Sequence, residues 1–83
     1  SSKDRLKSSV GKKLKSLRKS KKITQKQLAN RTGLSPSLLS QIENGQIAAS
    51  LVTLDKLSAA LNVKIAYFLD EETDKPAGTI AGK

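Results

Sequence analysis

The stretch TGLSPSLLSQIENG, residues 32–45, decides the fold of this chain of 83 residues because it carries signals for both ends of a short helix. Ser35 can cap the helix N-terminus, and Pro36 fits the first helical position, where no backbone N–H is needed. Asn44 and Gly45 can end the helix. The apolar residues of this helix share one face, which we predict to be buried: Leu38, Leu39 and Ile42. The outer face is polar but has neither Lys nor Arg.

The residues just before this helix predict a second short helix and a tight turn. Thr24 stands three residues before Gln27, the spacing of a capping box, in which each side chain accepts a hydrogen bond from an unpaired backbone N–H at the helix start. Leu28 and Ala29 supply a buried face, and Gly33 allows the left-handed conformation that ends such a helix. Two short helices joined by a glycine-containing turn are typical of a helix-turn-helix.

Apolar periodicity predicts one helix before this pair and two after it. Residues 9–20 repeat apolar side chains at helical spacing and carry lysines on the other faces: Val10, Leu14 and Leu17 against Lys12, Lys13, Lys15 and Lys19. Ser50 can cap a fourth helix that ends at Asn62, with a stripe of Leu54, Leu57 and Leu61. A short last helix would carry Ile65, Phe68 and Leu69. We therefore predict an all-α fold of five helices, the second and third forming the helix-turn-helix.

The composition excludes several classes of function. The chain has no Cys and no His, which excludes thiolate metal sites, Cys nucleophiles and imidazole proton shuttles. The acidic residues near the C-terminus, from Asp70 to Asp74, lack the spacing of a metal-binding loop. No apolar run approaches the ~18 residues of a membrane span. We expect a soluble, cytoplasmic protein that is not an enzyme, does not bind a membrane, and needs no metal or cofactor.

The net charge of +9 is concentrated in the first part of the chain. Twelve of the sixteen Lys and Arg residues lie between Lys3 and Arg31, where Asp4 is the one acid. A basic surface of this kind attracts nucleic-acid phosphates because binding releases condensed counterions. The alternative interpretation is a solvated surface that keeps the protein soluble.

The uncharged outer face of the third helix suits base recognition. The second helix of a helix-turn-helix enters the DNA major groove, where donors and acceptors on base edges identify the sequence. Gln41 can bond adenine at N6 and N7, whereas Ser37 and Ser40 can bond any base. Lysines at these positions would add affinity with little selectivity. We therefore expect basic neighbours to hold the DNA backbone while the third helix reads bases.

From Val10 to Leu69 the chain resembles the phage repressor and Cro class of helix-turn-helix domains, also called the xenobiotic-response-element family. The matching stretches are LKSLRKSKKITQKQLANRTGLS (14–35), SQIENG (40–45) and SLVTLDKLSAALNV (50–63). The resemblance implies a five-helix lambda-repressor-like bundle that binds double-stranded operators as a homodimer. The basic residues at the start and the Pro- and Gly-containing stretch ETDKPAGTIAGK (72–83) add to this a division into a basic N-terminal arm (1–8), the DNA-binding domain (9–70) and a tail or linker (71–83). A C-terminal effector domain such as a cupin barrel could follow in a longer regulator.

The resemblance also assigns roles to individual residues. The base-reading positions fall on Pro36, Ser37 and Gln41, with Ser40 beside them. Phosphate contacts are expected from polar and basic residues around the helix-turn-helix: Gln25, Ser35, Asn44, Gln46, Lys19 and Lys22. A structural ion pair between the first helix and the end of the third is expected to join Arg18 and Glu43. Each polar residue also has a plain structural interpretation, as a helix cap or a solvated side chain.

Two positions depart from the family pattern. Pro36 has no hydrogen-bond donor and could make only apolar contact, for example with a thymine methyl group. The loop GQIAAS, residues 45–50, lacks the Lys or Arg that relatives often place there. We therefore expect DNA binding to depend more on the first helix and on Lys3, Arg5 and Lys7, acting as an arm.

Two other functions use the same fold. A protein-interaction module, such as an antitoxin or a regulator subunit that binds a protein partner, would expose an apolar patch, expected around Ile65, Tyr67 and Phe68. An RNA-binding or nucleoid-coating protein would need charge over the third helix or aromatic stacking residues, and the sequence has neither. The operator sequence, the regulated genes and the choice between repression and activation are not encoded in any of these patterns.

Overall fold

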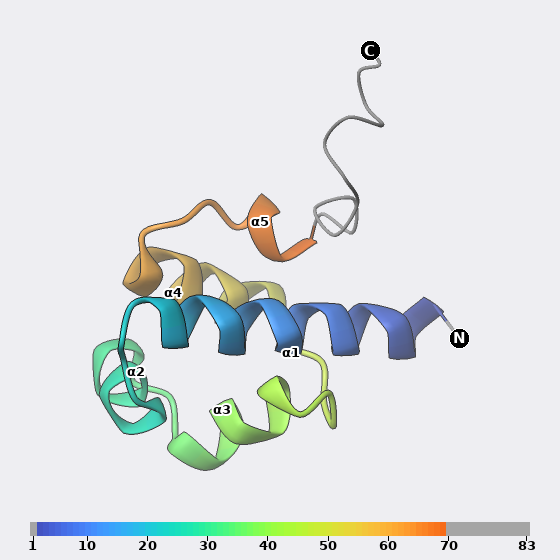
Figure 1. The fold of residues 1–83 in the computed structure, drawn as a ribbon. Coiled ribbons are helices and arrows are strands. Elements are labelled where there is room, and N and C mark those ends of the chain that lie inside the picture. Colours follow the sequence, from blue (N-terminus) through green and yellow to red (C-terminus); the bar gives the residue numbers. More distant parts are fainter. Residues whose placement is uncertain (1, 70–83) are drawn as a thin grey trace.

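The computed structural model describes residues 2–69 of the chain, with side chains described from residue 6 onward. This part is helical, with five helices and no strand, so the predicted all-α fold is confirmed (Figure 1). The helices are α1 (Ser2–Ser20), α2 (Gln25–Thr32), α3 (Pro36–Glu43), α4 (Leu51–Leu61) and α5 (Ala66–Leu69). None of them has an apolar stretch long enough to cross a membrane.

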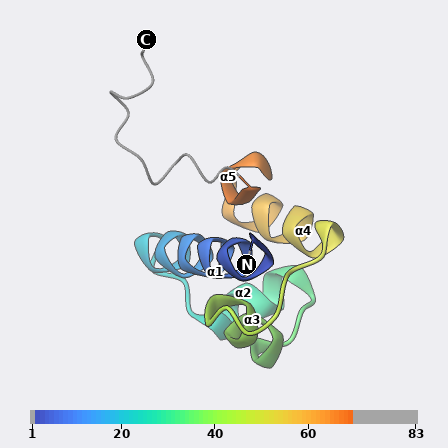
Figure 2. The same ribbon diagram turned by 90° about the vertical axis from the view of Figure 1, so that its right-hand side faces the viewer.

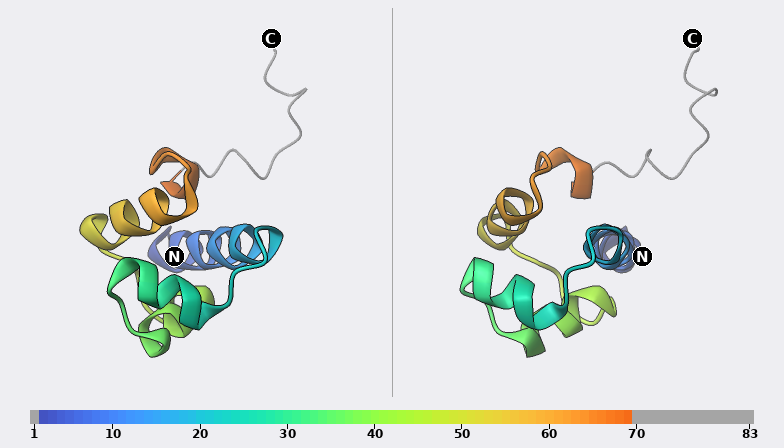
Figure 3. Two further views of the ribbon diagram at one scale, coloured as in Figure 1. Left: turned by 90° about the vertical axis from the view of Figure 1, so that its left-hand side faces the viewer. Right: turned by 60° about the vertical axis from the view of Figure 1, so that its left-hand side comes forward.

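Helix α1 packs against α3 and against α5, and α2 packs against both α3 and α4 (Figures 2 and 3). The apolar stripes of the helices meet in one core, because each helix has a single apolar face to bury. The largest fully buried side chains are Leu14, Leu28, Leu39, Ile42, Leu57, Leu61 and Phe68. One face of α3 packs into this core, and the opposite face of the helix is toward solvent.

Hydrogen bonds fix the starts of α2 and α3, and a glycine ends α2 in the turn between them. The Gln27 backbone N–H donates to Thr24 Oγ1 (3.0 Å), and the Thr24 backbone N–H donates to Gln27 Oε1 (2.9 Å). Gly33 ends α2 at φ +77°, and Ser35 Oγ accepts from the Leu38 backbone N–H (3.0 Å) at the start of α3. The capping box, the glycine turn and the serine cap are confirmed as predicted. Gly33 and the Ser35 cap shape the turn that joins the two helices.

The ends of α3 and α4 also follow the local signals. Gly45 follows α3 at φ +73°, a conformation that favours glycine because it has no Cβ. Ser50 Oγ accepts from the Thr53 backbone N–H (3.1 Å) and caps α4. Asn62 ends α4 in the left-handed region at φ +59°.

The first helix differs from its prediction in two ways. It begins at Ser2 rather than near residue 9, so residues 2–8, expected to act as an arm, form the first turns of α1. These residues include no Gly or Pro, and nothing in them stops a helix. Lys13 was expected on the solvated face but is only 6% exposed, with Nζ 5.9 Å from the ring centroid of Tyr67. The segment 71–83, predicted to be a tail, lies outside the described residues.

Candidate nucleic-acid interface

The outer face of α3 is polar and uncharged, as the sequence predicts. Pro36, Ser37 and Gln41 are exposed and Ser40 is half-buried, whereas Leu39 and Ile42 on the opposite face are buried in the core. Ser37, Ser40 and Gln41 stand at i, i+3 and i+4, so their side chains lie on one side of the helix. The structure therefore presents hydroxyl and amide groups together on one accessible surface.

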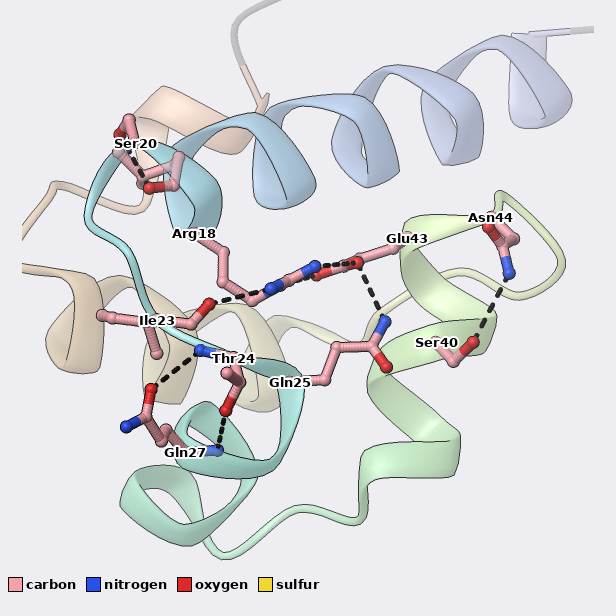
Figure 4. A network of polar contacts seen from close by, with 10 residues as sticks. Arg18, Ser20, Ile23, Thr24, Gln25, Gln27, Ser40, Glu43 and Asn44 are labelled. Atoms are coloured by element: carbon pink, nitrogen blue, oxygen red, sulfur yellow. Dashed lines mark hydrogen bonds and ion pairs between the residues drawn. The ribbon is translucent and has the colours of Figure 1, made fainter.

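A buried ion pair ties the end of α3 to α1 (Figure 4). Arg18 Nε donates to Glu43 Oε2 (2.6 Å) and Nη2 donates to Oε1 (3.1 Å), a two-pronged contact between side chains that are 11% and 2% exposed. Arg18 Nη1 also donates to the Ile23 carbonyl oxygen (2.8 Å). The hydrogen bond with Glu43 raises the pKa of Arg18 above its ordinary value. The expected structural pair is present, and it fixes the end of α3 against α1 and the α1–α2 turn.

Gln25 joins this buried network at the start of α2. Its Nε2 donates to Glu43 Oε1 (3.0 Å), so the side chain expected to hold a phosphate also links α2 to α3 (Figure 4). An amide nitrogen carries two hydrogens, and the contact with Glu43 uses one of them. The first backbone N–H groups of α2 lie beside it, as at any helix N-terminus. The network therefore positions Gln25 without using its full donor capacity.

Asn44 and Ser40 contact each other at the end of α3. Asn44 Nδ2 donates to Ser40 Oγ (3.4 Å), and the Asn44 backbone N–H donates to the Ser40 carbonyl oxygen (3.0 Å). The next exposed residue, Gln46, donates its backbone N–H to the Gln41 carbonyl oxygen (2.9 Å). Gln46 is thus held close to the polar face of α3. The phosphate contacts of Asn44 and Gln46 stay predictions.

The basic residues lie mainly on α1, on the turn after it and on α2. Lys19 and Lys22, predicted to contact phosphate, are exposed. Lys22 has φ +58°, a left-handed conformation that is costly for a residue with a Cβ. It lies where the chain reverses after α1 and the Ile23 backbone N–H donates to the Arg18 carbonyl oxygen (3.1 Å). Further exposed cations lie on α1, in this turn and on α2: Lys12, Lys15, Lys21, Lys26 and Arg31.

Gly11 is a residue that the sequence analysis missed. A Cβ at this position would clash with the carbonyl oxygen of Ile42 and would lie 2.7 Å from that of Glu43. The absence of a side chain lets the end of α3 approach the middle of α1 closely. A glycine inside an amphipathic helix lowers helix stability, so Gly11 was the signal in the sequence that could have pointed to a packing constraint here.

The apolar patch expected for a protein partner is not where the sequence analysis placed it. Phe68 is fully buried, and Ile65 and Tyr67 are half-buried against the core. Phe68 packs edge-on to Tyr67, with ring centroids 5.4 Å apart. These side chains therefore hold α5 against the core, and the exposed large apolar residues of the described chain are Leu6, Leu51, Val52 and Leu69.

Comparison with known proteins identifies the family. The profile of the helix-turn-helix family HTH_3 matches residues 14–68. The chain belongs to this helix-turn-helix family. It is 41% identical over 64 residues to the immunity repressor protein of Bacillus phage phi105, covering 77% of this chain and 44% of that protein. It is 39% identical over 64 residues to the HTH-type transcriptional regulator SinR of Bacillus subtilis, covering 76% of this chain and 58% of that protein.

A solved structure shares the fold of this chain. The restriction-modification controller protein C.AhdI of Aeromonas hydrophila superimposes with a TM-score of 0.72 at 34% identity, covering 75% of this chain and 94% of that one. The resemblance to the phage repressor class is therefore confirmed. The chain spans about half the length of the curated relatives it matches.

Proposed function

We propose that this helix-turn-helix chain is a sequence-specific regulator of transcription, acting as a repressor, that binds double-stranded DNA through the major groove. The observation that carries the proposal is the exposed, uncharged face of α3, with Ser37, Ser40 and Gln41 on one side of a helix whose other side is locked into the core. Gln41 has no capping or core contact and is suited to adenine. The names of the similar proteins support this function: a phage immunity repressor, a transcriptional regulator and a restriction-modification controller protein.

The proposed DNA contacts fall into two groups: exposed lysines that attract phosphate, and polar residues that position α3 on the DNA backbone. The exposed lysines of α1 and of the turn after it supply affinity for phosphate, which depends on salt and not on sequence. Gln25, with the first backbone N–H groups of α2, is suited to hold one phosphate at a helix N-terminus. Because Gln25 is hydrogen-bonded to Glu43 at the end of α3, this phosphate would set the position of α3 in the groove. Ser35, Asn44 and Gln46 would contact the backbone at the two ends of α3.

We further propose that two copies act together on an inverted repeat. In a two-fold complex the α3 helices would enter successive major grooves about 34 Å apart, which sets the spacing of the half-sites. The chain would perform no reaction and would act in the cytoplasm on the nucleoid. In a longer regulator, a C-terminal effector domain would control this binding.

Selection of bound duplexes from a randomised pool, at a stated salt concentration, tests the function directly. We expect enrichment of an inverted repeat with half-sites one helical turn apart. Recovery of duplexes without any shared sequence would contradict sequence-specific recognition. Enrichment of a single, unrepeated site would retain specificity and contradict the two-fold arrangement.

A further inference from the structure

A shallow hollow between α2 and α4 has two cations in its lining. The hollow has a volume of about 370 Å³ and is lined by residues from the end of α2 and the second half of α4: Arg31, Thr32, Lys56, Ala59 and Ala60. Figure 3 shows this side of the molecule, with α4 above the end of α2. The lining residues of α4 stand at i, i+3 and i+4, so they share one side of that helix. The two small alanine side chains leave space beside the two long cationic ones.

The two cations of the hollow have no anionic partner within residues 6–69. Both side chains are exposed, and neither makes an ion pair or a side-chain hydrogen bond with another residue of this range. The acids of the same range are Glu43, which is buried, and Asp55, which is on α4 but does not line the hollow. Thr32 Oγ1 donates to the Leu28 carbonyl oxygen (2.8 Å), so this hydroxyl hydrogen is already used. A ligand in the hollow would therefore meet two positive charges and no negative one.

The hollow lies away from the proposed DNA surface. Arg31 is in the last turn of α2 and Gln25 is its first residue, so the two positions are about 9 Å apart along the helix axis. No residue of α1 or α3 lines the hollow. With α3 in the major groove and Gln25 at a phosphate, the hollow would stay open to solvent.

We propose that this hollow is a docking site for an acidic peptide segment of a partner protein, with neighbouring carboxylates held by Arg31 and Lys56. A guanidinium binds a carboxylate through two parallel hydrogen bonds, and the ammonium group adds a second charged contact. Cations that line one hollow attract an anion more strongly than lysines spread over the convex surface of α1.

The depth of the hollow favours a peptide over a small molecule. Three of its five lining residues are exposed, and the other two are half-buried. Sites for small molecules enclose most of the ligand surface, which this hollow cannot do. An acidic peptide extends beyond the two cations and gains further contacts along α2 and α4.

The test uses a hexaglutamate peptide, blocked at both ends, and follows the backbone amide resonances of the full chain by NMR without DNA. The variant Arg31→Gln, Lys56→Gln removes both cations of the hollow. The control variant Lys12→Gln, Lys15→Gln removes the same charge from two exposed positions on α1. A blocked hexaglutamine peptide controls for contacts that do not need charge.

In the unmodified chain, hexaglutamate should shift the resonances of residues 31–32 and 56–60 most. Removal of both hollow cations should weaken peptide binding at least about fivefold, and the α1 control should weaken it less. The proposal is overturned if the largest shifts lie on α1, if the variant without hollow cations binds hexaglutamate as the unmodified chain does, or if hexaglutamine binds equally well. Equal shifts from free glutamate at the same carboxylate concentration would indicate a small-molecule site and overturn the peptide partner.

DNA titrations separate this site from the proposed DNA surface. The variant without hollow cations should bind duplexes within about twofold of the unmodified chain, because exposed charges about 10 Å apart are largely screened by salt. The α1 control should bind duplexes less tightly and with a weaker salt dependence. An equal loss from both variants would place the hollow on the DNA surface and overturn the proposal. Failure of the unmodified chain to select any duplex would contradict the proposed function alone, since the peptide titration does not involve DNA.

Discussion

Helix α3 and the turn at the end of α1 are neighbours joined by the Arg18–Glu43 pair, yet they differ in charge and in backbone conformation. The α3 helix is capped at Ser35, buried on one side and uncharged on the other. The turn after α1 carries exposed lysines and holds Lys22 in a conformation that a side chain rarely adopts. Recognition of bases needs a fixed geometry, whereas attraction of phosphates needs only charge at the right distance. This difference is the basis of the predictions below.

The largest expected effect comes from breaking the ion pair that fixes α3. Replacing Glu43 by Leu leaves the Arg18 guanidinium buried without its carboxylate and should lower the free energy of unfolding by about 3–5 kcal/mol. Urea unfolding measures this loss. The double variant Arg18→Met, Glu43→Leu removes both charges and should recover much of the stability. If Glu43→Leu alone costs less than about 1 kcal/mol, the pair is not what holds α3 in place.

The next largest effect is expected from adding a side chain at Gly11, where α1 and α3 are in close contact. Gly11→Ala should lower the free energy of unfolding by about 1–3 kcal/mol, because the new methyl group meets the carbonyl oxygens of Ile42 and Glu43. Ser16→Ala, at an exposed site on the same helix, is the control and should be neutral or slightly stabilising. A stabilised Gly11→Ala variant would show that the two helices do not need this close contact.

A third substitution separates base reading from phosphate binding. Gln41→Ala should weaken binding to the selected operator by about 1–3 kcal/mol and relax the preference at one base pair of each half-site. Lys19→Ala should weaken selected and random duplexes alike and reduce the salt dependence of binding. Titrations of both duplex types over a range of salt concentrations measure the two effects. Equal losses on both duplexes from Gln41→Ala would refute its role as a base reader.

The smallest expected effect concerns the strained turn. Lys22→Gly relieves the left-handed conformation and should raise the free energy of unfolding by about 0.5–1 kcal/mol, while DNA binding weakens through loss of a cation. Lys21→Gly, the next residue in the same turn, has no positive φ to relieve and should lower stability instead. Thermal unfolding of the two variants distinguishes the conformational effect from the effect of charge.

Much of the candidate site follows from local signals. The helix starts at Thr24 and Ser35 depend on hydrogen bonds within three residues, and the stops at Gly33 and Asn62 depend on the conformational preference of one residue. Such interactions are visible in the sequence because both partners are near neighbours. The uncharged face of α3 follows from the same periodicity that predicts its buried side.

Other features depend on segments that are remote in the chain. The burial of Lys13 under Tyr67, the close contact at Gly11 and the contact of Gln25 with Glu43 all join residues from different helices. The expected patch around Ile65, Tyr67 and Phe68 was wrong because α5 folds back onto the core and buries these side chains. Hydrophobicity alone does not distinguish an apolar residue that packs inside from one that stays outside.

The sequence by itself determined the five helices, the ends of α2, α3 and α4, the helix-turn-helix and the separation of the basic residues from the uncharged face. These depend on backbone capping, on periodicity and on charge, which act over a few residues. Only the tertiary structure decided which polar residues hold α3 in place, and where an apolar surface stays open. Both depend on the packing distances between helices, which no single segment of the chain determines.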